Sequence, residues 1–345
     1  MDRLCRLLLP ATLVAVMLLN VSLVMLPSAS ATKGSYSGGN GKIVFQAVPA
    51  GEQYGEIYLM NPDGSGITRL TSNSVDDADP CWSPDGSMIV YSSGGAIWVM
   101  SSDGSNRKQL TTPPEDTYDR DPAWSPDGNK IAFIRLYTGG AAFVYSLYVM
   151  GADGSNPTRL LPDEDYVYHP CWSPDGTKLV VGIDPDLAIV NPNGGTVTAK
   201  TSFGGLDFSA YDPCWSPDGS RITSTREYHS TGDEEACVIK GDLTETLTVL
   251  IENGGEPNWS PDGTKIVFSR IFRSIWIMNS DGSSASDLTP TMPGAEGPDF
   301  QRLPGRPVGG VVLPTSKLEI VAPFAALAGL VVAVSAVVVV KRRKD

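Results

Sequence analysis

The stretch Trp82-Ser83-Pro84-Asp85-Gly86 returns four more times along the chain, and this repetition decides the fold. The later copies begin at Trp124, Trp172, Trp215 and Trp259. A sixth, degenerate copy, Pro298-Asp299-Phe300-Gln301, carries Phe300 in the place of the tryptophan. From Trp82 to Phe300, successive copies are 42, 48, 43, 44 and 41 residues apart. A repeat of about 40–45 residues is typical of a four-stranded propeller blade.

Each repeat contains the same order of strands and turns. A short strand ends in the tryptophan, as in Pro122-Ala123-Trp124, and Ser-Pro-Asp-Gly follows as a hairpin turn in which glycine takes the left-handed position. A second strand such as 130–133 and a third such as 147–150 come next, followed by an Asp-Gly turn at 153–154. A fourth strand ends near a Leu-Thr pair, as at 110–111. The strands are apolar nearly throughout, which suits blades buried on both faces.

The two ends of the repeat region complement each other. The first unit begins directly with its second strand, Gly41-Lys42-Ile43-Val44-Phe45, and has no first strand of its own. A first strand around Asp299-Phe300 is left over at the far end. Pairing the two would close the ring and remove the exposed sheet edges. We therefore predict an all-β, six-bladed propeller over residues 41–301, closed by its C-terminal strand.

The repeat resembles the WD40-like repeat of TolB-type propellers. The resemblance rests on Asp-Pro-x-Trp-Ser-Pro-Asp-Gly, a short β-run, an aliphatic-aromatic run and Asp-Gly-Ser, and it extends over residues 41–301. It implies a central channel that such propellers commonly use for contacts with other proteins. Similar repeats also occur beside peptidase domains and in some propeller lyases, so the fold does not define the activity.

The N-terminus has the features of an export signal. Arg3 and Arg6 precede an apolar run from 7 to 26, and Ala29-Ser30-Ala31 offers small residues for a signal peptidase. We expect a signal peptide over 1–31, with an uncleaved N-terminal anchor as the alternative, and a linker over 32–40.

The C-terminus has the features of a membrane anchor. A stalk containing Pro and Gly (302–319) precedes residues 320–340, which carry no charge and as a helix would span about 31 Å. A buried core helix is the alternative, but the all-round apolar pattern and the basic residues 341–344 favour a single transmembrane helix with a cytoplasmic tail (341–345). The propeller is then extracytoplasmic. The segment 307–312 resembles the anchors of archaeal surface proteins, which suggests an archaeal cell surface.

The net charge limits the classes of partner. The chain carries 39 acidic and 26 basic residues, a formal net charge of −13. A negative field repels phosphate backbones, so we expect no nucleic-acid partner. Cations, basic peptides and neutral sugars remain compatible with this charge.

The residue before the first-strand proline of each blade is the main site candidate. Four carboxylates and a histidine there would lie on a common channel mouth and attract a basic peptide or a divalent cation such as calcium. The alternative is that each merely caps the turn into its strand. Two tyrosines beside the histidine and a glycine in the sixth blade break the symmetry. The candidates are Asp79, Asp121, His169, Asp212 and Glu256, with Tyr166 and Tyr168 beside them and Gly297 in the sixth place.

The remaining polar residues suggest structure more than chemistry. The aspartates of the Ser-Pro-Asp-Gly turns are explained by turn formation. Cys81, Cys171 and Cys214 each stand directly before the tryptophan of their repeat, and we expect them to be small buried residues between blades. Cys171 and Cys214 are the one pair that we consider for a disulfide. The sequence contains no Cys-x-x-Cys motif, so it gives no support for a zinc site. His229 is expected to be solvated in a loop.

The motifs favour binding over catalysis. The chain has neither a Gly-x-Ser-x-Gly elbow nor a Gly-rich phosphate loop, and we assign no catalytic residue and no required cofactor. We expect a surface-tethered, non-catalytic module that binds a protein or peptide, such as an envelope component, through its channel mouth and blade loops. The alternatives are an extracellular hydrolase or lyase acting on polysaccharide or peptide through His169, the tyrosines and a bound metal, and a structural component of the envelope.

Overall fold

A computed structural model describes residues 40–161, 166–203, 206–270, 274–292 and 294–303. The predicted signal segment (1–31), apolar C-terminal segment (320–340) and basic tail (341–345) lie outside the described residues, as do nearly all of the linker and stalk. Within the described ranges, no helix is long and apolar enough to cross a membrane.

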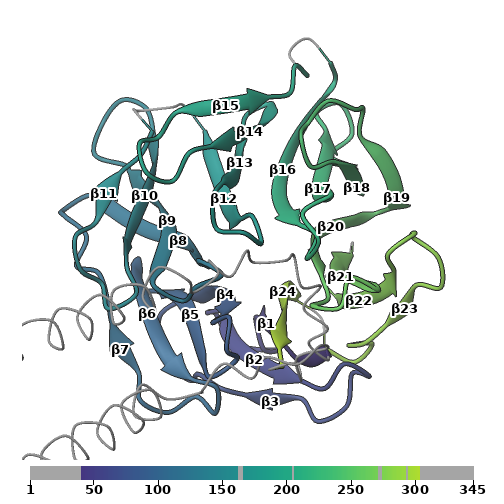
Figure 1. The fold of residues 1–345 in the computed structure, drawn as a ribbon. Helices are drawn as coiled ribbons and strands as arrows, with labels where there is room; N and C mark the ends of the chain where they lie inside the picture. Colours follow the sequence, from purple (N-terminus) through teal and green to yellow (C-terminus); the bar gives the residue numbers. More distant parts are fainter. Residues whose placement is uncertain (1–39, 162–165, 204–205, 271–273, 293, 304–345) are drawn as a thin grey trace, which may run out of the picture. The chain divides into compact units, whose positions relative to one another are not determined.

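The described strands form six antiparallel sheets of four strands each, arranged around a central axis as the blades of a propeller (Figure 1). Blade one contains β24 (Ala295–Arg302), β1 (Asn40–Ala47), β2 (Glu56–Met60) and β3 (Thr68–Arg69). Blade two contains β4 (Asp77–Trp82), β5 (Met88–Ser93), β6 (Ala96–Ser101) and β7 (Lys108–Gln109). Blade three contains β8 (Thr117–Trp124), β9 (Lys130–Tyr137), β10 (Val144–Gly151) and β11 (Thr158–Arg159).

The other three blades follow the same order from the axis outward. Blade four contains β12 (Val167–Trp172), β13 (Leu179–Ile183), β14 (Asp186–Val190) and β15 (Val197–Lys200). Blade five contains β16 (Phe208–Trp215), β17 (Arg221–Tyr228), β18 (Glu234–Lys240) and β19 (Thr248–Glu252). Blade six contains β20 (Gly254–Trp259), β21 (Lys265–Arg270), β22 (Ser274–Asn279) and β23 (Ser286–Asp287).

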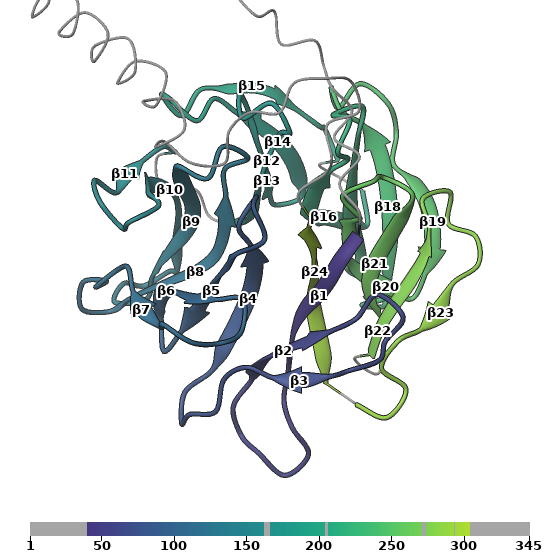
Figure 2. The ribbon, with the colours of Figure 1, turned by 60° about the horizontal axis from the view of Figure 1, so that its bottom comes forward.

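Blade one is built from both ends of the repeat region, which confirms the predicted closure. The last strand, β24, pairs antiparallel with β1, and Ile43 lies opposite Phe300. Figure 2 shows the two strands side by side, the first in purple and the last in yellow-green. The pairing gives β1 a partner on its inner edge, so the ring has no open seam.

The Ser-Pro-Asp-Gly turns have the predicted conformation. In the first copy Gly86 has a φ of 69°, in the left-handed region that glycine accepts without strain. The hydroxyl of Ser83 donates to Asp85 Oδ1 at 2.7 Å, and the backbone N–H of Ser87 donates to the same oxygen at 3.0 Å. The turn aspartates therefore have the local structural role expected of them.

Apolar clusters between neighbouring blades form the core. One cluster joins Val90 and Ile97 of blade two to Ile131 and Phe133 of blade three, all essentially buried. Equivalent clusters occupy the other five blade interfaces in the described part of the chain. Both faces of each blade are therefore covered, which explains the continuous apolar strands.

A buried hydrogen bond explains the Leu-Thr pair that ends several repeats. The hydroxyl of Thr71 accepts the backbone N–H of Ile57 at 2.9 Å, and Leu70 donates its own N–H to the carbonyl of Ile57 at 2.7 Å. The threonine thus satisfies a backbone donor where the outermost strand stops. The backbone N–H groups of Ile97 and Ile275 donate in the same way to the hydroxyls of Thr111 and Thr289. In blade four the N–H of Leu187 donates to the hydroxyl of Thr201, although Lys200 stands there in the place of the leucine.

Candidate functional site

The six residues that precede the first-strand prolines share an unusual backbone conformation. All have positive φ, 44–59°, although five of them are not glycine: Asp79, Asp121, His169, Asp212, Glu256 and Gly297. A non-glycine residue in this region costs free energy and persists only where surrounding contacts enforce it. In every blade the pairing of the first two strands is irregular at this point. We call these six residues the pre-proline ring.

The pre-proline ring lines a central cavity of about 300 Å³. All six blades contribute to the cavity, whose wall continues through the tryptophans to the prolines of the Ser-Pro-Asp-Gly turns. The cavity therefore has an ionisable ring in its wall beside aromatic and pyrrolidine surfaces. Five prolines contribute to it from the turns: Pro84, Pro126, Pro174, Pro217 and Pro261.

Hydrogen bonds connect the ring residues of successive blades. The N–H of Asp121 donates to Asp79 Oδ2 at 3.2 Å, and the N–H of His169 donates to Asp121 Oδ2 at 3.4 Å. The N–H of Gly297 donates to Glu256 Oε2 at 2.8 Å. These carboxylates thus accept backbone hydrogen bonds, which the capping alternative predicted. The donors, however, belong to the neighbouring blade and not to the turn of the same blade.

His169 lies between two carboxylates. Its Nδ1 is 2.5 Å from Asp212 Oδ1, and its Nε2 is 3.5 Å from Asp121 Oδ1. Burial disfavours the charged imidazolium and lowers the pKa of His169, but the charges of Asp121 and Asp212 outweigh it and hold the pKa well above the usual value. The two carboxylates therefore favour the cationic form of His169.

The negative charges of the other two carboxyl groups of the ring, Asp79 and Glu256, are only partly balanced by positive charge. Burial, with the charge of Asp121 adding to it, raises the pKa of Asp79. Burial and the charge of Asp212 raise the pKa of Glu256 to about 7. Outside the ring, Arg120 lies 3.5 Å from Asp121 Oδ1 and offsets part of the negative charge. The site would therefore gain stability from an added positive charge.

Three ring residues could hold a metal ion. One ligand atom each from Asp79, Asp121 and His169 lies within 4.8 Å of the others. Carboxylate oxygens and an imidazole nitrogen suit several divalent metals. Such an ion would require the protonated His169 to release a proton, because only a neutral imidazole is a ligand.

The two predicted tyrosines lie beside the ring but not in the cavity wall. Among the described residues, the wall includes His169 but neither Tyr166 nor Tyr168. Their rings pack with that of Tyr145, at centroid distances of 5.6 and 5.2 Å. The ring of Tyr168 also lies 6.4 Å from that of His169. The tyrosines therefore form an aromatic surface next to the histidine, with Tyr166 half-exposed.

Asp299 lines the cavity but was not among the site residues predicted from the sequence. Its carboxylate accepts the N–H of Trp82 at 2.7 Å and the side-chain amide of Asn258 at 3.0 Å, so it bridges blades two, one and six. Burial raises the pKa of Asp299 to about 6, although the hydrogen bond from Trp82 opposes the shift. The available signal was a carboxylate in the degenerate sixth copy, where other blades carry cysteine, alanine or asparagine.

The cysteines differ from expectation in their surroundings. Cys81, Cys171 and Cys214 are half-buried and contribute to the cavity wall, so they are not fully enclosed between blades. All three are free thiols, as is the buried Cys237. The Sγ of Cys171 accepts the N–H of Trp215 at 3.3 Å, a contact with the neighbouring blade.

His229 is exposed, as expected of a loop residue, but it also makes a specific contact. Its Nε2 lies 2.7 Å from the hydroxyl of Ser209, which also donates to Asp184. Ser209 and His229 both belong to blade five, and the hydrogen bond from Ser209 to Asp184 joins blade five to blade four. Neither Ser209 nor His229 contributes to the cavity wall.

The sequence matches the family model described as the TolB β-propeller domain over residues 27–144 and 130–296. Together these stretches cover most of the chain. The chain belongs to the TolB β-propeller domain family. This assignment confirms the resemblance of the repeat to that of TolB-type propellers.

Solved structures agree with the fold of this TolB-type propeller. TolB from Acinetobacter baumannii is 20% identical, with a TM-score of 0.65 over 78% of this chain and 67% of its own. A structure from Agrobacterium tumefaciens described as a candidate TolB is 20% identical, with a TM-score of 0.59 over 75% of this chain and 92% of its own. An oligogalacturonate lyase in complex with manganese is 15% identical, with a TM-score of 0.53 over 71% and 73%. At these identities the similarity establishes the fold alone.

Proposed function

We propose that this TolB-type propeller is a non-catalytic binding module that takes an extended, positively charged peptide segment into its central cavity. The observation that carries the proposal is the pre-proline ring, which directs four carboxyl groups and one histidine into one cavity wall. The membership of the TolB family supports a protein-binding role.

The shape and lining of the cavity favour a side chain of lysine or arginine. A volume of about 300 Å³ admits a side chain with its adjoining backbone and excludes a folded domain. The methylene groups of a basic side chain can lie against the tryptophan and proline rings while the charge reaches the carboxylates. The net charge of −13 would also attract a basic partner over longer distances.

The cellular setting is part of the same proposal. The predicted export signal and the predicted C-terminal transmembrane helix would place the propeller on the outer face of a cell membrane, where its ligand would be an envelope protein or peptide. Because the stalk is short, the cavity would remain near the membrane surface.

Neutralising the ring should abolish this binding. Peptides selected from a displayed library on the wild-type protein are expected to be enriched in lysine and arginine. For the selected peptides, we expect affinity to fall at least about 100-fold in the quadruple variant D79N/D121N/D212N/E256Q, because several charge-assisted contacts are lost together. The amide side chains keep an oxygen for the hydrogen bonds between blades. Isothermal titration calorimetry measures the change.

A charge-matched variant separates site binding from general attraction. E115Q/D233N/E245Q/E252Q removes the same number of negative charges from exposed positions outside the cavity wall. It should retain affinity within about threefold, because exposed charges are screened by salt. Equal losses in both variants, or unchanged binding by the ring variant, would contradict the proposal.

Binding should strengthen as the pH rises. Glu256 has a pKa of about 7 in the unliganded protein, so it is mostly protonated at pH 5.5 and mostly ionised at pH 8. A cationic ligand binds the ionised form, and we expect affinity to rise about tenfold between these values. Calorimetry on wild type and E256Q tests this, since the variant should lose most of the dependence. An affinity that falls with rising pH would contradict the assignment of Glu256.

A further inference from the structure

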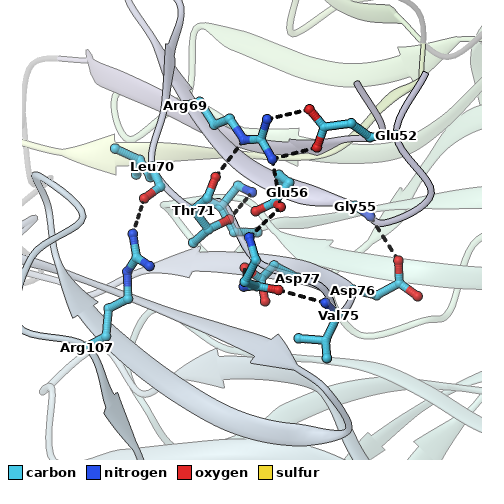
Figure 3. Close-up of polar contacts among 12 residues, drawn as sticks. Glu52, Gly55, Glu56, Arg69, Leu70, Thr71, Val75, Asp76, Asp77 and Arg107 are labelled. Carbon is cyan, nitrogen blue, oxygen red and sulfur yellow. Dashed lines mark hydrogen bonds and ion pairs between the residues drawn. The ribbon is translucent and has the colours of Figure 1, made fainter. Parts of the chain in front are cut away.

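A second group of acidic residues lies between blades one and two (Figure 3). Glu56 begins β2, and Asp77 begins β4 of the next blade. Both side chains are 0% exposed, whereas acidic residues are almost never fully buried unless they are paired. Neither contributes to the wall of the central cavity.

One guanidinium serves two of the carboxylates in this group. Arg69 donates two hydrogen bonds of 2.7 Å to Glu52 and one of 2.8 Å to Glu56 Oε1. The backbone N–H of Asn73 also donates to Glu56 Oε1, at 2.9 Å. The contacts of Glu56 are therefore concentrated on one of its two oxygens.

Two carboxylate oxygens of the group have no hydrogen-bond partner. The side-chain amide of Asn73 donates to Asp77 Oδ2 at 2.7 Å, but Asp77 Oδ1 and Glu56 Oε2 are both buried and unsatisfied. Leaving buried acceptors unpaired is costly. Burial raises the pKa of Asp77, and the nearby hydroxyls of Ser93 and Thr71 offset only part of the rise.

In the next blade the equivalent buried carboxylate is paired with an arginine. In blade three Asp119 occupies the position equivalent to Asp77 and lies opposite Arg135, which contacts both of its oxygens at 2.6 and 2.7 Å. In blade two the residue opposite Asp77 is Ser93. Among the described residues, no ion pair joins Asp77 to a basic side chain. Blade two therefore has the buried carboxylate without its cation.

We propose that a hard divalent cation of the calcium class binds between Glu56 Oε2 and Asp77 Oδ1. The three carboxylates of Glu52, Glu56 and Asp77 against the single Arg69 leave two negative charges, which one divalent ion neutralises. Calcium prefers carboxylate and neutral oxygen ligands, and the hydroxyls of Thr71 and Ser93 supply neutral oxygens nearby. The ion would link blade one to blade two, next to the closure of the ring.

The test removes bound metal from the full chain with a chelator. Calcium binding is then measured by calorimetric titration with calcium chloride, and stability is measured by thermal unfolding with and without calcium. We expect wild type to bind calcium at this site and to unfold at a higher temperature when calcium is present. D77N/E56Q should weaken this binding at least about tenfold and lose the temperature shift. S93R should also lose both, while keeping its fold without calcium, because the new guanidinium can occupy the place that Arg135 has beside Asp119.

The ring variant D121N distinguishes this site from the central cavity. Calcium binding that survives in D121N and disappears in S93R supports the proposal. Binding that disappears in D121N and survives in S93R and D77N/E56Q would place the ion in the cavity and overturn it. An unfolding temperature of wild type that does not respond to calcium would also overturn it, because protons would then neutralise the buried carboxylates.

Discussion

A chain that ends at Gly294 should fail to fold cooperatively, because it lacks the whole of β24. This strand supplies the innermost strand of blade one, and its Ala295 and Phe300 belong to the cluster that joins blade one to blade six. Without it, β1 exposes an unpaired edge and an apolar face, and we expect aggregation in place of a folded monomer. Circular dichroism during heating, together with size-exclusion chromatography, checks the result.

A milder change at the same strand gives a measurable free energy. Phe300 is 5% exposed, lies opposite Ile43 in the pairing of β24 with β1, and belongs to the same core cluster as Phe45. Phe300→Ala should lower the free energy of unfolding by about 3–5 kcal/mol, since it leaves a cavity in a closed interface. Phe300→Trp, which restores the residue of the other five repeats, is the matched control. A cooperative transition in the shortened chain, or a loss below about 1 kcal/mol for the alanine variant, would mean that closure contributes little.

Arg135→Leu should destabilise the propeller by about 3–5 kcal/mol, because it leaves the fully buried carboxylate of Asp119 without its partner. The guanidinium of Arg135 also lies 4.9 Å from the ring centroid of Tyr148, so the loss includes a cation–π contact. Chemical unfolding followed by tryptophan fluorescence measures the change.

The double variant D119L/R135L distinguishes the free-energy cost of an unpaired buried charge from the cost of lost packing. Removing both charges avoids the buried, unpaired carboxylate, so the double variant should be more stable than Arg135→Leu alone. If the two variants are equally unstable, the loss comes from packing, and the comparison between Asp119 and Asp77 loses its basis.

The fold follows from patterns within single repeats. The Ser-Pro-Asp-Gly turn has its own hydrogen bonds, from Ser83 and Ser87 to Asp85, and these depend on residues at most two positions from the aspartate. Apolar strands of fixed spacing then predict the blade, and the unpaired strands at the two ends predict the pairing of β1 with β24. All of these features are local or repeated, so residue order was sufficient to predict them.

The functional residues could be predicted only in part. The position before the strand proline was recognisable in every repeat, and the structure places all six of those residues in the cavity wall. The tyrosines were recognisable as a break in symmetry, but their rings turn toward Tyr145 instead of the cavity. Which way a side chain points from an irregular strand depends on the neighbouring blade.

Contacts between blades determine the ion pairs and the burial of the candidate site residues, and these could not be predicted from the order of residues in the sequence. The pairing of His169 with Asp121 and Asp212 joins three blades, and the bridging by Asp299 joins residues more than 200 positions apart. The burial of Asp77 beside Glu56, with a serine where the next blade has an arginine, likewise exists only across an interface. Turns and strands depend on short-range geometry, whereas the charge state of a buried group depends on every blade packed against it, which only the closed ring determines.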